Sequence, residues 1–254
     1  MKVTLLQLDS QWASPQDNIL RAQRLMAQQP NSDLYVLPEM WATGFATEPQ
    51  EIAEDEQQSL ALSWMCQTVR ERHCALCGSL AIATPDGRFR NRHYFVHPSG
   101  EVCFYDKHHL FTYGHEDRYY TAGDTHTIVD FMGFRILLLT CYDARFPVWS
   151  RYGRAGDYDI IVYVANWPQS RQSAWQILMR ARAIENQCFV VAVNRVGDDA
   201  ICHYAGNSAV IDARGNTLVR GRYDEECAVG CELQKETLTT MRQRFKVLDD
   251  RDLF

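Results

Sequence analysis

Three side chains of different chemistry each follow a strand-like run of the sequence. They are Glu39, Lys107 and Cys141, after the runs 34–37, 101–105 and 134–140. In α/β proteins the carboxyl ends of strands form the edge where sites are built. A carboxylate base, an ammonium and a thiol nucleophile are the groups needed to open a carbon–nitrogen bond through a covalent intermediate. The spacing therefore predicts a hydrolytic site at one edge of a sheet.

Cys141 is the most informative of the three. The apolar run before it indicates a buried strand, and we expect a helix to begin after it. Free N–H groups at the start of a helix stabilise a thiolate or an oxyanion. The alternative is that Cys141 only packs in the core, as most free cysteines do. The segments around Glu39 and Lys107 favour the nucleophile.

Glu39 and Lys107 have simple alternatives as well. Pro38 ends the strand before Glu39, and apolar side chains such as Met40 and Trp41 follow it, which suits a general base. Lys107 near a thiol is expected to lower the pKa of that thiol and to stabilise a negative oxygen. Either residue alone is more often a solvated surface charge.

The chain resembles the nitrilase, or carbon–nitrogen hydrolase, superfamily in several short segments. They are Leu37-Pro38-Glu39-Met40, Tyr105-Asp106-Lys107-x-His109-Leu110-Phe111, Cys141-Tyr142-Asp143-x-Arg145-Phe146-Pro147, Tyr163-Val164-Ala165-Asn166-Trp167-Pro168, Arg180-Ala181-Arg182-Ala183-Ile184-Glu185-Asn186 and Asn194-Arg195-Val196-Gly197. The resemblance implies Glu39 as general base, Lys107 as transition-state stabiliser and Cys141 as nucleophile. It also implies a second glutamate, which we assign to Glu116, with the adjacent Asp117 as the alternative.

Within the superfamily the chain is most similar to the omega-amidase branch. The segments Met40-Trp41-x-Thr43-Gly44-Phe45 and Trp167-Pro168 carry this similarity. The branch hydrolyses the terminal amide of 2-oxoglutaramate and 2-oxosuccinamate to ammonia and a 2-oxo dicarboxylic acid. An N-carbamoyl amine or amino acid hydrolase, or a nitrilase, would use the same residues. A non-catalytic binding protein of the same fold is the third alternative.

Other residues are candidates for holding the substrate. We expect the backbone N–H of Tyr142 to share the oxyanion with Lys107. Arg145 is a candidate partner for a substrate carboxylate, although an ion pair with Asp143 or a nearby glutamate would explain it equally. Aromatic candidates for the walls of a small pocket are Phe45, Tyr113 and Trp167. Ordinary core packing is the alternative for these three.

Composition excludes several classes of protein. A net charge of −6 and the lack of a basic cluster disfavour nucleic acid as a partner. We expect no signal peptide and no contact with a membrane, since the longest apolar runs fall short of the ~18 residues that span one. Nine cysteines scattered over strands and helices indicate reduced thiols in the cytoplasm. No cofactor is expected, and Cys74-x-x-Cys77 lacks the turn that a zinc site needs.

The pattern of apolar residues predicts an α/β fold in one domain, residues 1–254. Expected strands cover 2–8, 34–37, 74–82, 93–97, 101–105, 134–140, 159–164, 188–194 and 207–212, and expected helices cover 16–28, 57–72 and 171–187. In the last helix an apolar face is formed by Ala174, Ile177, Leu178, Ala181 and Ile184. The family implies a four-layer αββα sandwich of two mixed sheets flanked by helices, and a homodimer or higher homo-oligomer. Candidate contacts are Trp149, Tyr152, the helix 171–187 and the tail, about 234–254, with core packing as the alternative.

Overall fold

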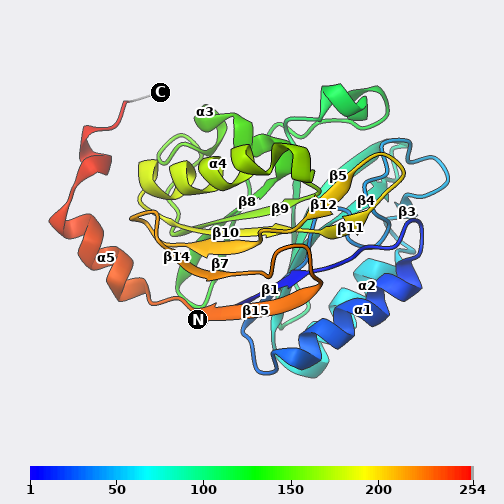
Figure 1. Ribbon diagram of the computed structural model, residues 1–254, viewed down its shortest axis with the longest axis horizontal. Coiled ribbons are helices and arrows are strands. Elements are labelled where there is room, and N and C mark those ends of the chain that lie inside the picture. Colours follow the sequence, from blue (N-terminus) through cyan, green and yellow to red (C-terminus); the bar gives the residue numbers. More distant parts are fainter. Residues whose placement is uncertain (253–254) are drawn as a thin grey trace.

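Two β-sheets lie face to face with helices on their outer sides (Figure 1). The structure is a computed structural model that describes residues 1–252. Helices α1 (Pro15–Gln28) and α2 (Leu60–Arg72) cover the outer face of one sheet. Helix α4 (Gln172–Glu185) covers the outer face of the other. The predicted four-layer αββα sandwich is confirmed.

The first sheet has the strand order β15-β1-β2-β4-β5-β6, with β3 paired to β4. Its strands are β1 (Lys2–Gln7), β2 (Leu34–Val36), β3 (Glu54–Asp55), β4 (Ala75–Ala83), β5 (Phe89–Val96), β6 (Val102–Asp106) and β15 (Cys227–Glu232). Neighbours β1, β2 and β4 are parallel, and β5 is antiparallel to both β4 and β6. Strands β2, β4 and β6 therefore end at the same edge.

The second sheet has the order β14-β13-β10-β9-β8-β7. Its strands are β7 (Ile128–Phe131), β8 (Phe134–Thr140), β9 (Ile160–Ala165), β10 (Phe189–Asn194), β13 (Ala209–Ile211) and β14 (Thr217–Arg220), and a separate ribbon pairs β11 (Val196–Asp198) with β12 (His203–Ala205). Strands β8, β9 and β10 are parallel and buried on both faces, so their sequences are continuous apolar runs.

The main core fills the space between the sheets. Val3 and Val36 of the first sheet share one apolar cluster with Leu138 and Val162 of the second. A smaller cluster lies between the first sheet and helices α1 and α2. The predicted strands and the three predicted helices are all present, with ends that shift by a few residues. The largest difference is β5, which begins at Phe89 rather than at residue 93.

The sequence pattern missed the elements at the edges of the sheets and near the carboxyl terminus. The helix α5 (Lys235–Arg244) follows β15 and extends away from the sheets in the lower left of Figure 1. Short helices include α3 (Pro147–Ser150) and the 3₁₀ turns Thr112–Gly114, Glu116–Arg118, Cys141–Arg145, Gln169–Arg171 and Val247–Asp250. Two residues of the tail predicted over 234–254 lie outside the described residues.

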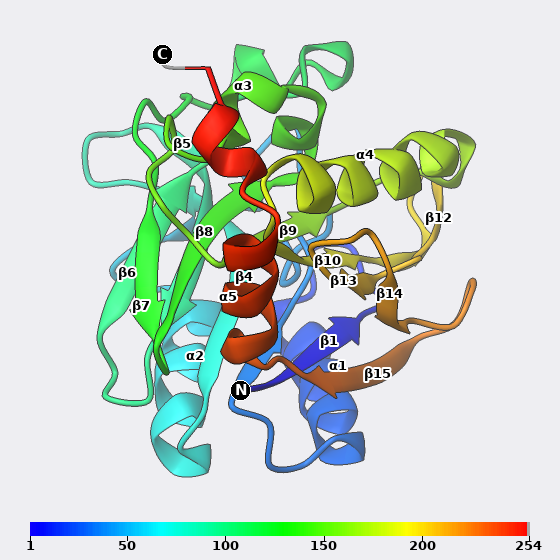
Figure 2. The ribbon, with the colours of Figure 1, turned by 90° about the vertical axis from the view of Figure 1, so that its left-hand side faces the viewer.

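Helix α4 packs on the second sheet with only part of the apolar face that its sequence shows, since Ala174 and Leu178 are partly buried against the core. Trp175 and Met179 are buried against the sheet, whereas Ile177 is 64% exposed and Ile184 is 50% exposed. Trp175 and Met179 lie one turn apart on the face of the helix that covers the sheet. Ile177 and Ile184 lie on the opposite side and point outward. Figure 2 shows this helix lying across the outer side of β9 and β10.

Candidate active site

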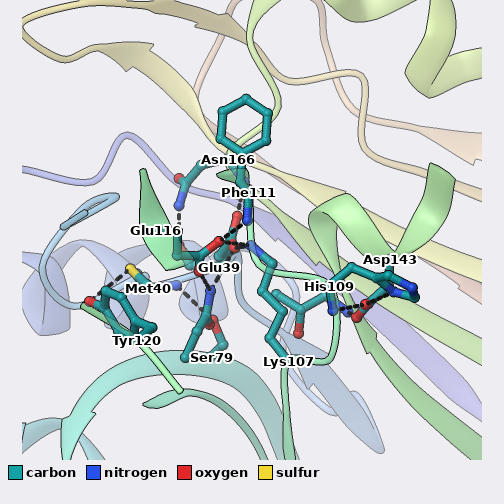
Figure 3. Close-up of polar contacts among 12 residues, drawn as sticks. Glu39, Met40, Ser79, Lys107, His109, Phe111, Glu116, Tyr120, Asp143 and Asn166 are labelled. Carbon is teal, nitrogen blue, oxygen red and sulfur yellow. Dashed lines mark hydrogen bonds and ion pairs between the residues drawn. The ribbon is translucent and has the colours of Figure 1, made fainter. Parts of the chain in front are cut away.

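Lys107 is the centre of a buried charged cluster. Its Nζ lies 2.9 Å from Oε1 of Glu39 and 2.7 Å from Oε2 of Glu116, and all three side chains are fully buried (Figure 3). Glu39 follows β2 and Lys107 follows β6, at the shared carboxyl edge of the first sheet. Glu116 comes from the 3₁₀ turn Glu116–Arg118, while Asp117 is exposed. Glu116 pairs with Lys107 rather than with Arg118, which lies two residues further along the same turn.

Cys141 lies against this cluster from the opposite sheet. It begins the 3₁₀ turn at the end of β8, and its thiol is close to the Glu39 carboxylate and the Lys107 ammonium. Its backbone φ of 44° lies in the left-handed region, which is strained for a side chain other than glycine. This sharp turn directs the thiol out of the strand, and the residue remains 8% exposed. The first N–H groups of the turn, including that of Tyr142, have no acceptor within the turn.

The charges around the thiol do not make it a stable thiolate. Burial raises the pKa of Cys141 well above its usual value, and Glu39 raises it further, so the opposing effect of Lys107 is outweighed. Lys107 does lower the pKa of the thiol, as expected, but this effect does not decide the net shift in the resting state. Burial alone lowers the pKa of Lys107, but the Glu116 and Glu39 carboxylates outweigh it and hold that pKa well above its usual value. Burial also raises the pKa of Glu116.

Two asparagines bind the carboxylate of Glu39. Asn91 Nδ2 donates to Glu39 Oε1 at 2.8 Å and to Glu116 Oε1 at 3.0 Å. Asn166, just beyond β9, donates its backbone N–H to Glu39 Oε2 at 2.8 Å and its side-chain Nδ2 to the Glu39 carbonyl oxygen at 2.8 Å. The sequence analysis gave neither residue a role. Asn166 lies in a segment that carried the family resemblance, whereas no signal marks Asn91.

Asp143 ties the Cys141 turn to the Lys107 segment. Its Oδ2 accepts from the Thr140 N–H at 3.0 Å and from the Tyr105 hydroxyl at 2.8 Å. Its Oδ1 accepts from the backbone N–H of His109 at 2.9 Å and lies 2.9 Å from that ring's Nδ1 (Figure 3). The carboxylate of Asp143 is thus occupied, and the predicted ion pair with Arg145 is absent.

Most of the predicted pocket residues lie near the cluster. The Phe45 ring centroid is 5.6 Å from Lys107 Nζ. The ring of Phe111, a residue without an assigned role in the sequence analysis, contacts Phe45 at 6.4 Å, Tyr142 at 5.2 Å and Tyr113 at 5.8 Å between centroids. Tyr113 is 80% exposed and lies at the outer end of this aromatic group.

Two arginines border the same aromatic group. Arg145 is exposed, and its Cζ lies 4.8 Å above the ring of Trp167. The Cζ of Arg171 lies 5.4 Å from the centroid of Phe111, and the Arg171 carbonyl accepts from Trp167 Nε1 at 2.8 Å. Within residues 1–252 neither guanidinium forms an ion pair. The sequence analysis singled out Arg145 alone.

Other chemical groupings are few in the described part of the chain. No group of three or more His, Cys, Asp or Glu side chains there has the arrangement of a metal site. All nine cysteines are free thiols. Among residues 1–252 no helix is both long and apolar enough to cross a membrane.

Comparison with known proteins finds relatives that match this sequence over its full length. Residues 2–243 match the family model of carbon–nitrogen hydrolases. An omega-amidase YafV of Yersinia enterocolitica is 42% identical, covering 100% of this chain and 98% of the relative. A 2-oxoglutaramate amidase of Bacillus subtilis is 31% identical, covering 99% and 98%.

Solved structures show the same fold. The protein XC1258 of Xanthomonas campestris, described as a CN-hydrolase superfamily member with an arsenic adduct in its active site, superposes with a TM-score of 0.95. It is 37% identical, and the match covers 100% of this chain and 98% of that one. Nit3 of Saccharomyces cerevisiae, at 24% identity and a TM-score of 0.87, shares the fold over 96% of this chain and 94% of its own. The chain therefore belongs to the carbon–nitrogen hydrolase family, the nitrilase superfamily, and is a hydrolase of non-peptide carbon–nitrogen bonds.

Proposed function

We propose that this protein is an omega-amidase, which hydrolyses the terminal amide of small 2-oxo dicarboxylic acid monoamides such as 2-oxoglutaramate. The observation that carries the proposal is the buried cluster in which Lys107 bridges Glu39 and Glu116 beside the Cys141 thiol. The full-length similarity to omega-amidases and to a 2-oxoglutaramate amidase supports the choice of substrate class.

The first half-reaction forms a thioester. Because the resting thiol holds its proton, Glu39 takes that proton as the thiol sulfur attacks the amide carbon. The carbonyl oxygen becomes an oxyanion, which the Lys107 ammonium and the Tyr142 N–H stabilise. Glu39 then returns the proton to the amide nitrogen, the carbon–nitrogen bond breaks and ammonia leaves. Cys141 retains the acyl group.

The second half-reaction restores the enzyme. Glu39, again a carboxylate, takes a proton from water as the water oxygen attacks the thioester carbon. The carbon–sulfur bond breaks, the sulfur receives the proton and the dicarboxylic product leaves. Glu116 keeps Lys107 in place throughout, because its 2.7 Å contact gives the ammonium a second carboxylate partner besides Glu39.

The carboxylate of the substrate needs a cation at the far end of the pocket. Arg145 and Arg171 both present a guanidinium without a carboxylate partner within the described residues, on an aromatic surface that includes Trp167 and Phe111. An amine substrate, as expected for an N-carbamoyl amine hydrolase, would instead need an acidic anchor. The two arginines therefore favour a 2-oxo acid amide over that alternative.

Ammonia release from 2-oxoglutaramate tests the proposal. Wild type is compared with Cys141→Ala and with Cys66→Ala, which removes a half-buried thiol of α2. Asparagine, glutamine and N-carbamoylputrescine are measured in parallel. Turnover of the 2-oxo amide that only Cys141→Ala abolishes supports the proposal. Cys141-dependent turnover of another compound alone would contradict the substrate class, and no turnover of any would favour a binding protein.

We also propose that the chain forms one catalytic domain, works as a homodimer or higher homo-oligomer, and functions in the cytoplasm. Exposed apolar side chains on the outer side of the second sheet support an oligomer, among them Val148 of α3 and Ile177 and Ile184 of α4. An apolar cavity of about 410 Å³ between α4 and α5 adjoins this face. Light scattering on the full chain tests this, and Ile177→Lys is expected to lower the measured mass. A monomeric wild type would contradict it.

A further inference from the structure

Asn91 contacts all three charged residues of the cluster, Glu39, Glu116 and Lys107. It lies in β5, opposite Ala81 of β4, and is 1% exposed. Its side-chain amide donates to both carboxylates, and its backbone carbonyl accepts from the Lys107 N–H at 3.0 Å. One residue thus contacts Glu39, Glu116 and the backbone of Lys107.

The orientation of the Asn91 amide is fixed by chemistry. Both of its short contacts, 2.8 and 3.0 Å, are to carboxylate oxygens, which only accept hydrogen bonds. A flipped amide would place an oxygen against Glu39 and Glu116, so the NH₂ group must face them. Asn91 therefore supplies two donors from one nitrogen without adding charge.

The hydrogen bond from Asn91 determines which oxygen of Glu39 can accept and donate a proton during the reaction. Oε1 accepts from both Asn91 and Lys107. Oε2 accepts only from the Asn166 N–H among the hydrogen bonds of the described residues. A carboxylate oxygen has two acceptor positions, so Oε2 keeps one for the thiol, the leaving nitrogen and the attacking water in turn.

We propose that Asn91 is a positioning residue for amide hydrolysis, which holds Glu39 and Glu116 in contact with Lys107 and leaves Glu39 Oε2 as the atom that carries the proton. The proposal rests on the proposed role of Glu39 as general base. Because the two N–H bonds end on Oε1 of each glutamate, they persist whether Oε2 is protonated or not.

Two near-isosteric variants test this role. Asn91→Leu removes both donors, and Asn91→Asp removes them while placing a third acid beside Glu39 and Glu116. For Asn91→Leu we expect kcat to fall about 10²-fold, since a misplaced catalytic group costs about that much, with KM nearly unchanged. The acid limb of the kcat profile moves to higher pH, because the amide donor lowers the pKa of Glu116 and its loss leaves the Glu116 carboxylate, which holds Lys107, easier to protonate.

Asn91→Asp has a distinct signature. At neutral pH it is expected to be slower than Asn91→Leu, because three carboxylates then surround Lys107. As the pH falls, its activity relative to Asn91→Leu rises, since a protonated aspartic acid offers one O–H donor. The ionisable groups around this position are Glu39, Glu116 and Lys107, and Tyr120 and Cys141 adjoin the same charges.

Asn186→Leu is the matched control. Asn186 is fully buried and its amide bonds to the Arg182 carbonyl and the Tyr152 N–H, outside the charged cluster. This variant is expected to lose thermal stability but to keep the wild-type pH profile. Asn91 variants that fold and keep the wild-type kcat, or lose activity with an unmoved acid limb, would overturn the proposal. Activity is measured on whichever amide the wild type turns over, so a different substrate would not affect the outcome.

Discussion

Two of the buried thiols, Cys141 and Cys77, each have beside them a side chain that could act as a base, and they differ in almost every property that matters for catalysis. Cys141 has Glu39 and Lys107 as neighbours at the end of β8. Cys77 lies in the middle of β4, with Sγ 2.9 Å from Nε2 of His93. A thiol and an imidazole at this distance resemble a nucleophile and its base. The comparison shows why proximity alone does not make a catalytic pair.

Position in the strand separates the two sites. Cys77 is fully buried, and its neighbours in β4 pair along their length with β5. No free N–H group is available there to hold an oxyanion. Burial lowers the pKa of His93 to about 3, and its Nδ1 lies 3.1 Å from the Leu139 carbonyl oxygen of β8. This pair joins the two sheets, whereas Cys141 lies at a strained strand end with free N–H groups and a cation.

The largest expected effect compares Cys141→Ala with Cys77→Ala. Loss of the nucleophile is expected to lower kcat by more than about 10⁴-fold. Cys77→Ala is expected to keep most of its turnover but to unfold more easily, by about 1–3 kcal/mol, because His93 loses a buried partner. Steady-state ammonia release and chemical denaturation measure the two effects. Equal losses of activity in both variants would contradict the distinction between the sites.

Glu39→Gln removes the base while preserving the shape of the side chain. We expect kcat to fall by about 10²–10⁴-fold, the usual contribution of general acid–base catalysis. Both half-reactions use Glu39, so a burst of ammonia before the steady state is not expected. Rapid-quench measurement of ammonia checks this. A variant with wild-type kcat would exclude Glu39 as the base.

Arg145→Gln and Arg171→Gln extend the comparison to substrate binding. Within residues 1–252 these two arginines, which border the aromatic group near Cys141, form no ion pair, and none of the contacts of Cys77 is with such a cation. For 2-oxoglutaramate we expect KM to rise about tenfold in the variant that removes the anchor, equivalent to ~1.4 kcal/mol. An uncharged amide of similar length serves as the control, because its KM is not expected to change. Equal changes for both amides would indicate a structural role for these arginines.

A further effect, on stability rather than on turnover, concerns His93 and pH. In the unfolded chain this imidazole takes up a proton near its ordinary pKa of 6.5, whereas in the fold it stays neutral down to a pKa of about 3. Its contribution to stability is therefore present above pH 6.5 and is lost as the pH falls toward 3, with a slope of up to ~1.4 kcal/mol per pH unit. His93→Gln removes this slope, which urea titrations at several pH values measure. An unchanged slope would contradict the buried neutral imidazole.

The sequence predicts well that Glu39, Lys107 and Cys141 meet at strand ends, because each of them follows a strand-like run. Glu116 rather than Asp117 was also predicted, from family resemblance. Asn91 was missed because β5 is antiparallel to its neighbours, so this residue reaches the same edge near the start of its strand. Looking for site residues only at the carboxyl ends of strands therefore misses Asn91, which lies near the amino end of β5.

Other features could not be predicted because they depend on burial and on distances between side chains, which a sequence does not contain. The raised pKa of Cys141 results from burial and Glu39 outweighing Lys107, and neither burial nor distance is visible in the chain. Edge elements such as β14 and α5 are half exposed and lack a strong apolar pattern. The apolar spacing of α4 left two alternatives open, a subunit contact or core packing, because spacing does not reveal which face of a helix meets the sheet.

Peptide-level mapping of iodoacetamide alkylation, followed in time together with ammonia release, tests the central claim most directly. The account predicts that activity declines in step with modification of Cys141, that bound product slows both, and that Cys77 remains unmodified in the folded protein. Full modification of Cys141 with activity retained, or activity lost while Cys141 is still free, would contradict the assignment of Cys141 as the nucleophile.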